Sequence, residues 1–424
     1  MNTLTQICVI LLTLLPGLVK AAACETTPEP LSGQLRELHN TEATHLQYQF
    51  DSGARWELCW HIDEHAGLVL SRIFYGAPAE PLRQVLDAAS LGQILFKYDE
   101  DINASHLLSE SGLGGDRSLS PEPSQCQNGA VVSGAKGKQI CRRVRQINHM
   151  TKVRHSDSIR RHELSLHAWS QLGGHLFQQI WRLSEDGEIK PSIMFSGTIN
   201  RYTSDPRFGI RLDDSNRYAA SATLLYNWRL DFNINGTPAN DQVDEFEFSP
   251  VVTDVVKREL KIQHLSIETM RPTDREVFRG WRISDAEQSS GADSGAAATT
   301  RIGYYLDPQS AGYRNSSEKH QWAQYDLTVT ARHPCEKLAS ANRLINAGCT
   351  DSLDEYVNDE SLRNNDIVVW FSVSQHFTPR LEDFPAITAT ESGFKLIPFD
   401  WSANSPFSPA PAVAGVSAYP EGQR

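Results

Sequence analysis

The stretch DIVVWFSVS, residues 366–374, indicates the fold of this chain most directly. It is a short run of β-branched and aromatic residues, a composition that is typical of a β-strand. Similar runs recur along the chain, and Gly, Pro, Asp or Asn residues interrupt them. They are LQYQF (46–50), ARWELCWHI (54–62), GLVLSRIFY (67–75), HELSLHAW (162–169), FEFSPVV (246–252) and YDLTVTA (325–331). This pattern predicts a mainly β protein that forms one large sandwich.

Helical patterns are scarce in the sequence. Residues 80–95 (EPLRQVLDAASLGQIL) and 335–348 (CEKLASANRLINAG) have the best helical spacing, and we expect a helix in each. Residues 287–300 (EQSSGADSGAAATT) are a low-complexity loop. Residues 404–424 are rich in proline and predict an extended C-terminal tail.

Composition limits the classes of function. The chain has 424 residues, with 40 Lys+Arg against 52 Asp+Glu and a formal net charge of −12. Hydrophobic residues make up 40% of it and nine are Trp, which indicates a folded globular chain. The acidic balance and the lack of a basic stripe argue against binding to nucleic acid.

The N-terminus predicts export from the cytoplasm. Residues 7–19 (ICVILLTLLPGLV) form a short apolar core, and the small residues Ala21-Ala22-Ala23 follow it. This pattern predicts a signal peptide over residues 1–23, a linker over 24–34 and a secreted or periplasmic protein. An alternative is a lipoprotein acylated on Cys24. No other apolar run is long enough to cross a membrane.

The cysteines support an oxidising compartment. Of seven cysteines, Cys8 would leave with the signal peptide, so an even number remains. An even count in an exported chain predicts disulfides. The short intervening loops pair Cys126 with Cys141 and Cys335 with Cys349, and the remainder is Cys24 with Cys59.

Several blocks of sequence, in order, resemble the catalytic domain of copper amine oxidases. The resemblance spans most of the chain, and it predicts a domain over residues 35–403. The blocks are GLVLSRIFY (67–75), PLRQVLDAASLGQILFKYDED (81–101), SGLGG (111–115), WRLSEDGEIKPSIMFSGTI (181–199), YNWRLDFNING (226–236), NNDIVVWFSVSQHFTPRLEDFP (364–385) and GFKLIPFDW (393–401).

The resemblance implies a β-supersandwich that usually forms an intertwined homodimer. It also implies a set of catalytic residues. In that family a tyrosine becomes the quinone cofactor topaquinone, an aspartate is the base, and three histidines bind copper.

The position of the quinone tyrosine is occupied by a different residue here. Counted from Trp181 and from Asp186-Gly187, this position falls on His175, and an imidazole cannot become a quinone. The position of the base, counted from residues 112–114, falls on Leu107.

The copper positions are also changed. Counted from residues 229–231, two of them fall on Ala222 and Leu224, and the third falls on Phe377, three residues before Arg380. The neighbouring His376 would point to the opposite face of its strand. Apolar residues at these positions predict a filled site, because unsatisfied buried polar groups are costly.

The sequence therefore predicts neither copper nor topaquinone. We expect a pseudoenzyme that binds a small ligand or a protein partner, neither of which the sequence identifies. One alternative is an enzyme that uses the remodelled cavity for cofactor-independent chemistry with His175. Another is a copper- and quinone-dependent primary amine oxidase, which would require the positions assigned above to be wrong.

One metal site of the family has more of its residues in place. The resemblance implies a peripheral calcium-type site with side-chain oxygens from Asp231, Asn233 and Asp366 and the main-chain carbonyls of Phe232 and Ile367. Oxygen ligands in this number suit a hard cation. The amide at Asn233 removes one charge and should weaken binding. The alternative is a hydrogen-bonded strand pairing without a cation.

Strand and turn patterns predict the surroundings of three histidines. His162 and His167 lie in a strand pattern, and we expect them at the surface or hydrogen-bonded in the core. His175 follows two glycines, which predicts a histidine at a turn, with a base or a ligand as the alternative.

Overall fold

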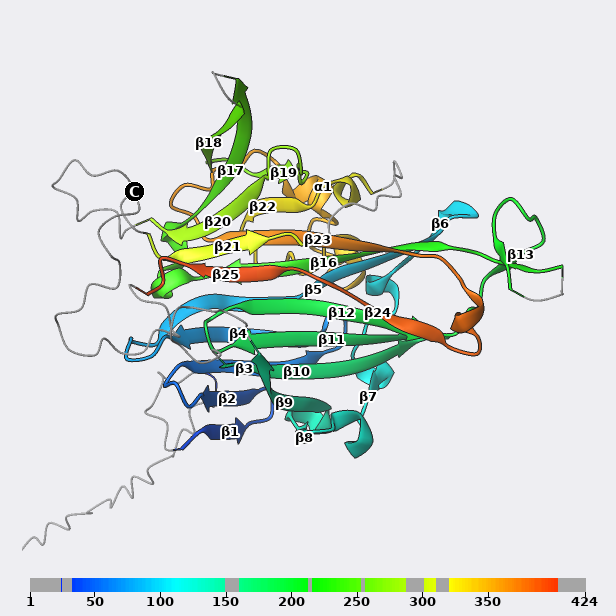
Figure 1. Ribbon diagram of the computed structural model, residues 1–424, viewed down its shortest axis with the longest axis horizontal. Coiled ribbons are helices and arrows are strands. Elements are labelled where there is room, and N and C mark those ends of the chain that lie inside the picture. The colour runs from blue at the N-terminus through cyan, green and yellow to red at the C-terminus, as the bar shows by residue number, and fades with distance from the viewer. Residues whose placement is uncertain are drawn as a thin grey trace, which may run out of the picture.

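The computed structural model describes residue 24 and residues 33–148, 160–212, 216–252, 256–286, 301–309 and 320–402. The predicted signal peptide (1–23), the loop 287–300 and the tail 404–424 lie outside the described residues, as does most of the linker 24–34. Two large antiparallel sheets form the body of the protein (Figure 1).

The first sheet has ten strands. Its order is β1-β2-β3-β4-β5-β16-β23-β22-β19, and β6 pairs with β5. The bounds are β1 (Leu35–His39), β2 (Thr44–Gln49), β3 (Arg55–Asp63), β4 (Gly67–Gly76), β5 (Arg83–Tyr98), β6 (Asp101–Leu107), β16 (Ala222–Phe232), β19 (Thr269–Arg271), β22 (Leu327–Ala331) and β23 (Ile367–Phe377).

The second sheet has twelve strands. Its order is β18-β17-β20-β21-β25-β12-β11-β10-β9-β8, while β24 pairs with β12 and β7 with β10. The bounds are β7 (Ser118–Leu119), β8 (Gly129–Ser133), β9 (Gln139–Asn148), β10 (Arg160–Leu172), β11 (His175–Ser184), β12 (Ile189–Gly197), β17 (Asp241–Val252), β18 (Val256–Leu265), β20 (Gly280–Asp285), β21 (Gly303–Asp307), β24 (Ile387–Gly393) and β25 (Lys395–Phe399).

The core lies between the two sheets. Trp181 of β11 and Trp228 of β16 meet edge to face, with ring centroids 5.2 Å apart. Trp56 of β3 donates its indole N–H across the core to the Ser184 carbonyl at 2.9 Å. Because side chains alternate along a strand, one face of each sheet supplies this core. The predicted β-sandwich is confirmed, and each of the quoted strand runs lies largely within a strand.

The two predicted helices were wrong. Residues 83–98 form β5, which pairs with β4 on one side and β16 on the other. Both faces of a central strand are buried, so its apolar run has no clear alternation and resembles a helix in sequence. Of residues 335–348, only Asn342–Leu344 form a 3₁₀ turn. There the Asn342 amide bonds to the Cys335 and Thr350 carbonyls, which competes with a helix.

Short elements complete the architecture. The described residues contain the α-helix α1 (Leu353–Tyr356), and a small sheet pairs β13 (Tyr202–Thr203), β15 (Tyr218–Ala219) and β14 (Ile210–Arg211). Figure 1 shows the β17–β18 hairpin extending away from the sandwich. Within the described residues, no helix has the length and apolar character needed to cross a membrane.

The three predicted disulfides are confirmed. Their Cα–Cα distances are 6.1 Å for Cys24–Cys59, 5.6 Å for Cys126–Cys141 and 5.9 Å for Cys335–Cys349. Disulfides persist in oxidising environments, so these bonds indicate an extracellular-type compartment.

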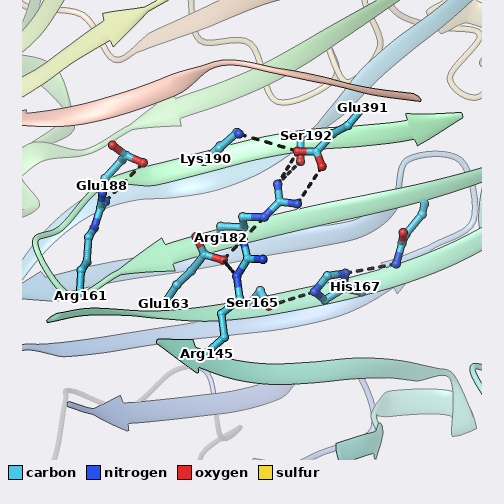
Figure 2. Close-up of polar contacts among 11 residues, drawn as sticks. Arg145, Arg161, Glu163, Ser165, His167, Arg182, Glu188, Lys190, Ser192 and Glu391 are labelled. Atoms are coloured by element: carbon cyan, nitrogen blue, oxygen red, sulfur yellow. Dashed lines mark hydrogen bonds and ion pairs between the residues drawn. The ribbon is translucent and has the colours of Figure 1, made fainter. Parts of the chain in front are cut away.

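The outer face of the twelve-stranded sheet carries a chain of ion pairs (Figure 2). Arg182 makes two bonds to the Glu391 carboxylate, at 2.6 and 2.9 Å, and one to Ser192 at 2.6 Å. On its other side it lies 3.7 Å from Glu163, which also pairs with Arg145 at 2.9 Å. The charges on this face therefore neutralise one another across β9, β10, β11, β12 and β24.

Candidate functional site

A cavity of about 280 Å³ opens where β5, β6 and the turn between β10 and β11 meet. About half of its lining residues are aromatic or aliphatic, and polar side chains, including the charged Glu110 and Arg117, make up most of the rest. Small-molecule sites commonly have this composition. The lining residues are Ile94, Phe96, Tyr98, His106, Leu107, Leu108, Glu110, Ser111, Arg117, Leu172, Gly173, His175, Phe177 and Asn200.

Three polar side chains form a connected group in this cavity. Tyr98 donates its hydroxyl hydrogen to Asn200 Oδ1 at 2.9 Å, and the Tyr98 oxygen lies 3.3 Å from His175 Nε2. Since the one hydroxyl hydrogen of Tyr98 is donated to Asn200, the Tyr98 oxygen accepts from His175 Nε2–H, and the neutral ring then carries no hydrogen on Nδ1. That Nδ1 is buried and has no hydrogen-bond partner among the described residues.

The sequence around His175 fixes its position. Gly173 has a positive φ of 56° in the tight turn that joins β10 to β11, and His175 is the first residue of β11. Its ring stacks on Phe96 at 5.0 Å and packs on Phe195 at 5.3 Å. The expected turn histidine therefore lies at the end of a turn and also lines the cavity.

Burial shifts the pKa values of His175 and Tyr98 in opposite directions. Burial, with a smaller contribution from His106, lowers the pKa of His175 to about 4. Burial raises the pKa of Tyr98 to about 12, although Arg201 opposes this shift. At neutral pH both side chains are uncharged, so the cavity offers hydrogen bonds without a net charge at this point.

The two positions that the resemblance assigns to the base and the quinone share this cavity. Leu107 and His175 both line it. Leu107 ends β6 opposite Leu95 of β5, and its side chain is buried. A leucine cannot take up a proton, so His175 is the group of this pair that can act as an acid or a base.

The three positions assigned to copper lie together on two neighbouring strands. Ala222 of β16 pairs with Phe377 of β23, and Leu224 pairs with Gln375. Ala222 and Leu224 are fully buried, and Phe377 packs on the core and against the Phe195 ring. None of the three side chains offers a donor atom, so the residues present do not fit a copper ion.

The neighbouring histidine points elsewhere, as its place in the strand predicts. His376 pairs with Thr223 and is exposed. Its Nε2 lies 2.6 Å from Asp99 Oδ2, which also accepts a hydrogen bond from Ser221. His376 therefore does not replace the residue at position 377 on the core side.

The residues of the implied cation site lie where β16 ends and β23 begins. Asp231 is buried, and its Oδ2 accepts bonds from Arg229 at 3.1 Å and Arg332 at 2.8 Å. Arg332 also lies 3.5 Å from Asp366 Oδ2. By contrast, the Oδ1 atoms of Asp231, Asn233 and Asp366 are buried and have no hydrogen-bond partner among the described residues.

These free oxygens fit a hard cation better than a simple strand pairing. A buried acceptor without a partner is costly, and a bound cation or water would satisfy it. Phe232 and Ile367, the predicted carbonyl donors, are the neighbours of Asp231 and Asp366 in the chain. Elsewhere among the described residues, as here, no three His, Cys, Asp or Glu side chains gather closely enough to hold a metal. A cation here would depend on Asn233 and on carbonyls.

His162 and His167 have hydrogen-bond partners within the sheet. His162 Nδ1 lies 3.1 Å from Glu185 Oε2. His167 is buried between Ser165 at 2.9 Å and Gln178 at 3.2 Å (Figure 2). Burial, with nearby arginines, lowers the pKa of His167 to about 3.

Comparison with known proteins identifies the family that has this architecture. The family described as "Copper amine oxidase, enzyme domain" matches residues 142–414, which is more than half of the chain. The chain belongs to the copper amine oxidase family. The resemblance predicted from the sequence blocks is confirmed.

Two known amine oxidases are similar in sequence to parts of this chain. A primary amine oxidase of Arthrobacter sp. (strain P1) is 28% identical over 239 residues, covering 53% of this chain and 36% of that protein. A histamine oxidase of Arthrobacter globiformis is 23% identical over 427 residues, covering 88% and 58%. The chain thus spans roughly one third to three fifths of the length of these relatives.

Solved structures show the shared fold. A copper-containing benzylamine oxidase from Hansenula polymorpha has a TM-score of 0.69 at 16% identity, covering 90% of this chain and 64% of that one. An Aspergillus nidulans amine oxidase also has a TM-score of 0.69, at 18% identity, covering 96% and 57%. The expected β-supersandwich is therefore confirmed.

Sequence reasoning missed the polar residues of the cavity that accompany His175, including the bonded pair Tyr98 and Asn200. Tyr98 lies within the quoted block 81–101, but its role depends on its hydroxyl reaching His175 and Asn200 across the sandwich. Asn200 directly follows the block 181–199. The direction of the Tyr98 side chain could have been read only after 83–98 was recognised as a strand.

Proposed function

We propose that this amine-oxidase-like chain is an exported, non-redox binding protein that holds a small ligand in its remodelled cavity. One observation carries the proposal. Hydrocarbon side chains fill the assigned copper positions Ala222, Leu224 and Phe377, whereas a cavity beside them stays open around His175.

The cavity favours a ligand with an apolar body and one hydrogen-bonding group. Phe96, Phe177 and Leu107 would contact the body, because burial of apolar surface drives such binding. The Tyr98–His175 pair would meet the polar group with neutral donors and acceptors.

Binding can be tested with benzyl alcohol as the probe. We expect a saturable rise in the melting temperature and chemical-shift changes confined to residues around His175. Leu107→Trp, which would fill the cavity, should abolish both effects. Leu381→Trp is the matched control, because Leu381 is 67% exposed and does not line the cavity. Equal responses from the wild type and the Leu107 variant would contradict binding in this cavity.

Loss of amine oxidase chemistry has a separate test. Protein loaded with copper under air should develop no quinone absorbance, because the assigned quinone position is His175. Metal analysis should show no stoichiometric copper. A quinone band, or one copper per chain, would favour a primary amine oxidase that uses other residues.

A second candidate function is cofactor-independent chemistry by His175. Its support is the buried, unpartnered Nδ1 beside an open cavity, which leaves a neutral imidazole able to accept a proton. Hydrolysis of p-nitrophenyl acetate would report it. A rate above that of His175→Gln, rising through about pH 4, would favour an enzyme, and equal rates would argue against it.

We also propose that the Asp231–Asn233–Asp366 group binds calcium. The three free Oδ1 atoms support this, together with the arginine bonds that hold the opposite oxygens of the two aspartates. Calcium should stabilise protein that has been stripped with a chelator. Magnesium should do so less, because it demands octahedral geometry and gives up its waters reluctantly, whereas calcium accepts carboxylate, amide and carbonyl oxygens in flexible geometry.

Export and dimerisation complete the proposal. The disulfides and the apolar N-terminus support a cleaved signal peptide, which N-terminal sequencing of the secreted protein would test.

Exposed Phe248, Leu260 and Ile262 on the β17–β18 hairpin support a homodimer in which this hairpin contacts the partner. Sedimentation of wild type and of Leu260→Glu/Ile262→Glu would test the dimer.

A further inference from the structure

A third acidic side chain lies next to the proposed calcium site. Asp241 is the first residue of β17 and is only 3% exposed. Its Oδ2 accepts the main-chain N–H of Ile234 at 3.1 Å, and Ile234 directly follows Asn233. This bond ties the Asp241 carboxylate to the chain segment that carries the site.

Asp241 has the same arrangement of oxygens as the two aspartates of the site. One carboxylate oxygen is held by a donor, and the other, Oδ1, is buried with no hydrogen-bond partner among the described residues. A free oxygen of a buried carboxyl group calls for a water molecule, a cation or a proton, and burial beside Asp285, Asp366 and Asp231 raises the pKa of Asp241 to about 8. Asp285, which pairs with Asp241 in the sheet, is different, because the amides of Asn235 and Asn240 bond to its two oxygens.

The charge of the site indicates what Asp241 contributes. Asp231 and Asp366 are the two acidic side chains of the proposed ligand set, and Asn233 is neutral. Arg229 and Arg332 already neutralise part of the aspartate charge from the Oδ2 side. The set therefore needs a further negative charge to attract a divalent cation.

We propose that Asp241 supplies this charge through a bound water molecule. Direct contact is not expected, because no three acidic side chains gather closely enough among the described residues to bind one metal together. A water held between Asp241 Oδ1 and the cation would satisfy both. This inference rests on the calcium site proposed above and names a positioning and charge-supplying residue for it.

The experiment is a calcium titration by calorimetry of chelator-stripped, full-length protein. Asp241→Asn keeps an oxygen for the Ile234 N–H but removes the charge, and we expect calcium affinity to fall by about 10- to 100-fold. Asp244→Asn, an acid on the same strand that pairs with Arg282 instead, is the control and should bind calcium like the wild type.

A charge exchange separates this role from a loss of folding. Asn233→Asp should raise affinity, and the double variant Asn233→Asp/Asp241→Asn should bind within a few-fold of the wild type. Near-ultraviolet circular dichroism without calcium would check that each variant is folded. If the wild type binds no calcium, the site itself is wrong. If the wild type binds and Asp241→Asn binds equally well, the site stands and the role of Asp241 is overturned.

Discussion

Ala222 on β16 lies directly opposite Phe377 on β23, and both side chains pack into the same core. Directly opposed residues of an antiparallel pair share a face of the sheet, with Cβ atoms roughly 5 Å apart. Leu224 lies two residues along the same face. Three donor side chains at these positions could converge on one ion, whereas three hydrocarbon side chains close the space by packing.

Replacing two of the three positions assigned to copper with histidine should destabilise the protein. In Ala222→His/Leu224→His, each buried imidazole lacks a partner, at a cost of about 1–3 kcal/mol apiece. Copper should not restore the melting temperature, because Phe377 supplies no third ligand. Adding Phe377→His should produce copper-dependent stabilisation and a copper(II) signal in electron paramagnetic resonance. Leu230→His, a core-facing position on β16 that lies opposite Val369, is the control, and copper-dependent stabilisation of that control would contradict the assignment.

Tyr98→Phe should weaken the cavity's polar group while keeping its packing. The variant removes the hydroxyl that bonds Asn200 and lies against His175, at a cost of about 1 kcal/mol of unfolding free energy. Affinity for benzyl alcohol should fall about 5- to 10-fold. Urea unfolding and ligand titration would measure the two effects. Tyr305→Phe is a matched control outside the cavity, and an equal loss of affinity there would contradict the role of Tyr98.

Stability should fall as the pH drops from about 6.5 towards 4, in part because of two histidines. Burial lowers the folded-state pKa of His175 to about 4 and that of His167 to about 3. The unfolded chain, with histidine pKa values near 6.5, then binds more protons than the folded chain in this window. Their contribution is fully present above about pH 6.5. Together they add a slope of at most about 2.7 kcal/mol per pH unit.

Urea unfolding between pH 4.5 and 7.5 would measure this slope. His175→Gln and His167→Gln should each make the curve flatter, because each variant removes one titrating group. His376→Gln is the comparison, since that side chain is exposed. A curve with the same slope in all four proteins would show that neither buried histidine resists protonation.

The sequence predicted the strands because they depend on local pattern, whereas the site positions came from the resemblance to the copper amine oxidase family. Residues two apart on a strand share a face, so Ala222 and Leu224 could be placed together without coordinates. The three disulfides followed from cysteine count and loop length. In contrast, β5 looked helical because both of its faces are buried over residues 91–98, a tertiary effect that residues 83–98 do not encode alone.

The cavity was harder to predict than the filled metal positions. Tyr98, Asn200 and His175 come from distant parts of the chain and meet only when the two sheets pack. The free oxygen of Asp241 likewise depends on a turn that returns the chain to Ile234. Spacing in the sequence does not report such contacts.

Removing Arg182 from the ion-pair chain should lower the free energy of unfolding far more than removing Arg145 at its exposed edge. The Arg182 side chain is 10% exposed and bonds Glu391 and Ser192, so Arg182→Met removes both short bonds to Glu391 and leaves it only Lys190 at 3.8 Å (Figure 2). The loss should cost about 3 kcal/mol. Arg145, which pairs with Glu163 from a side chain that is 58% exposed, is the matched control. Arg145→Met should cost less than about 1 kcal/mol. Urea unfolding in low and high salt would compare them, and equal costs would show that burial does not set the strength of these pairs.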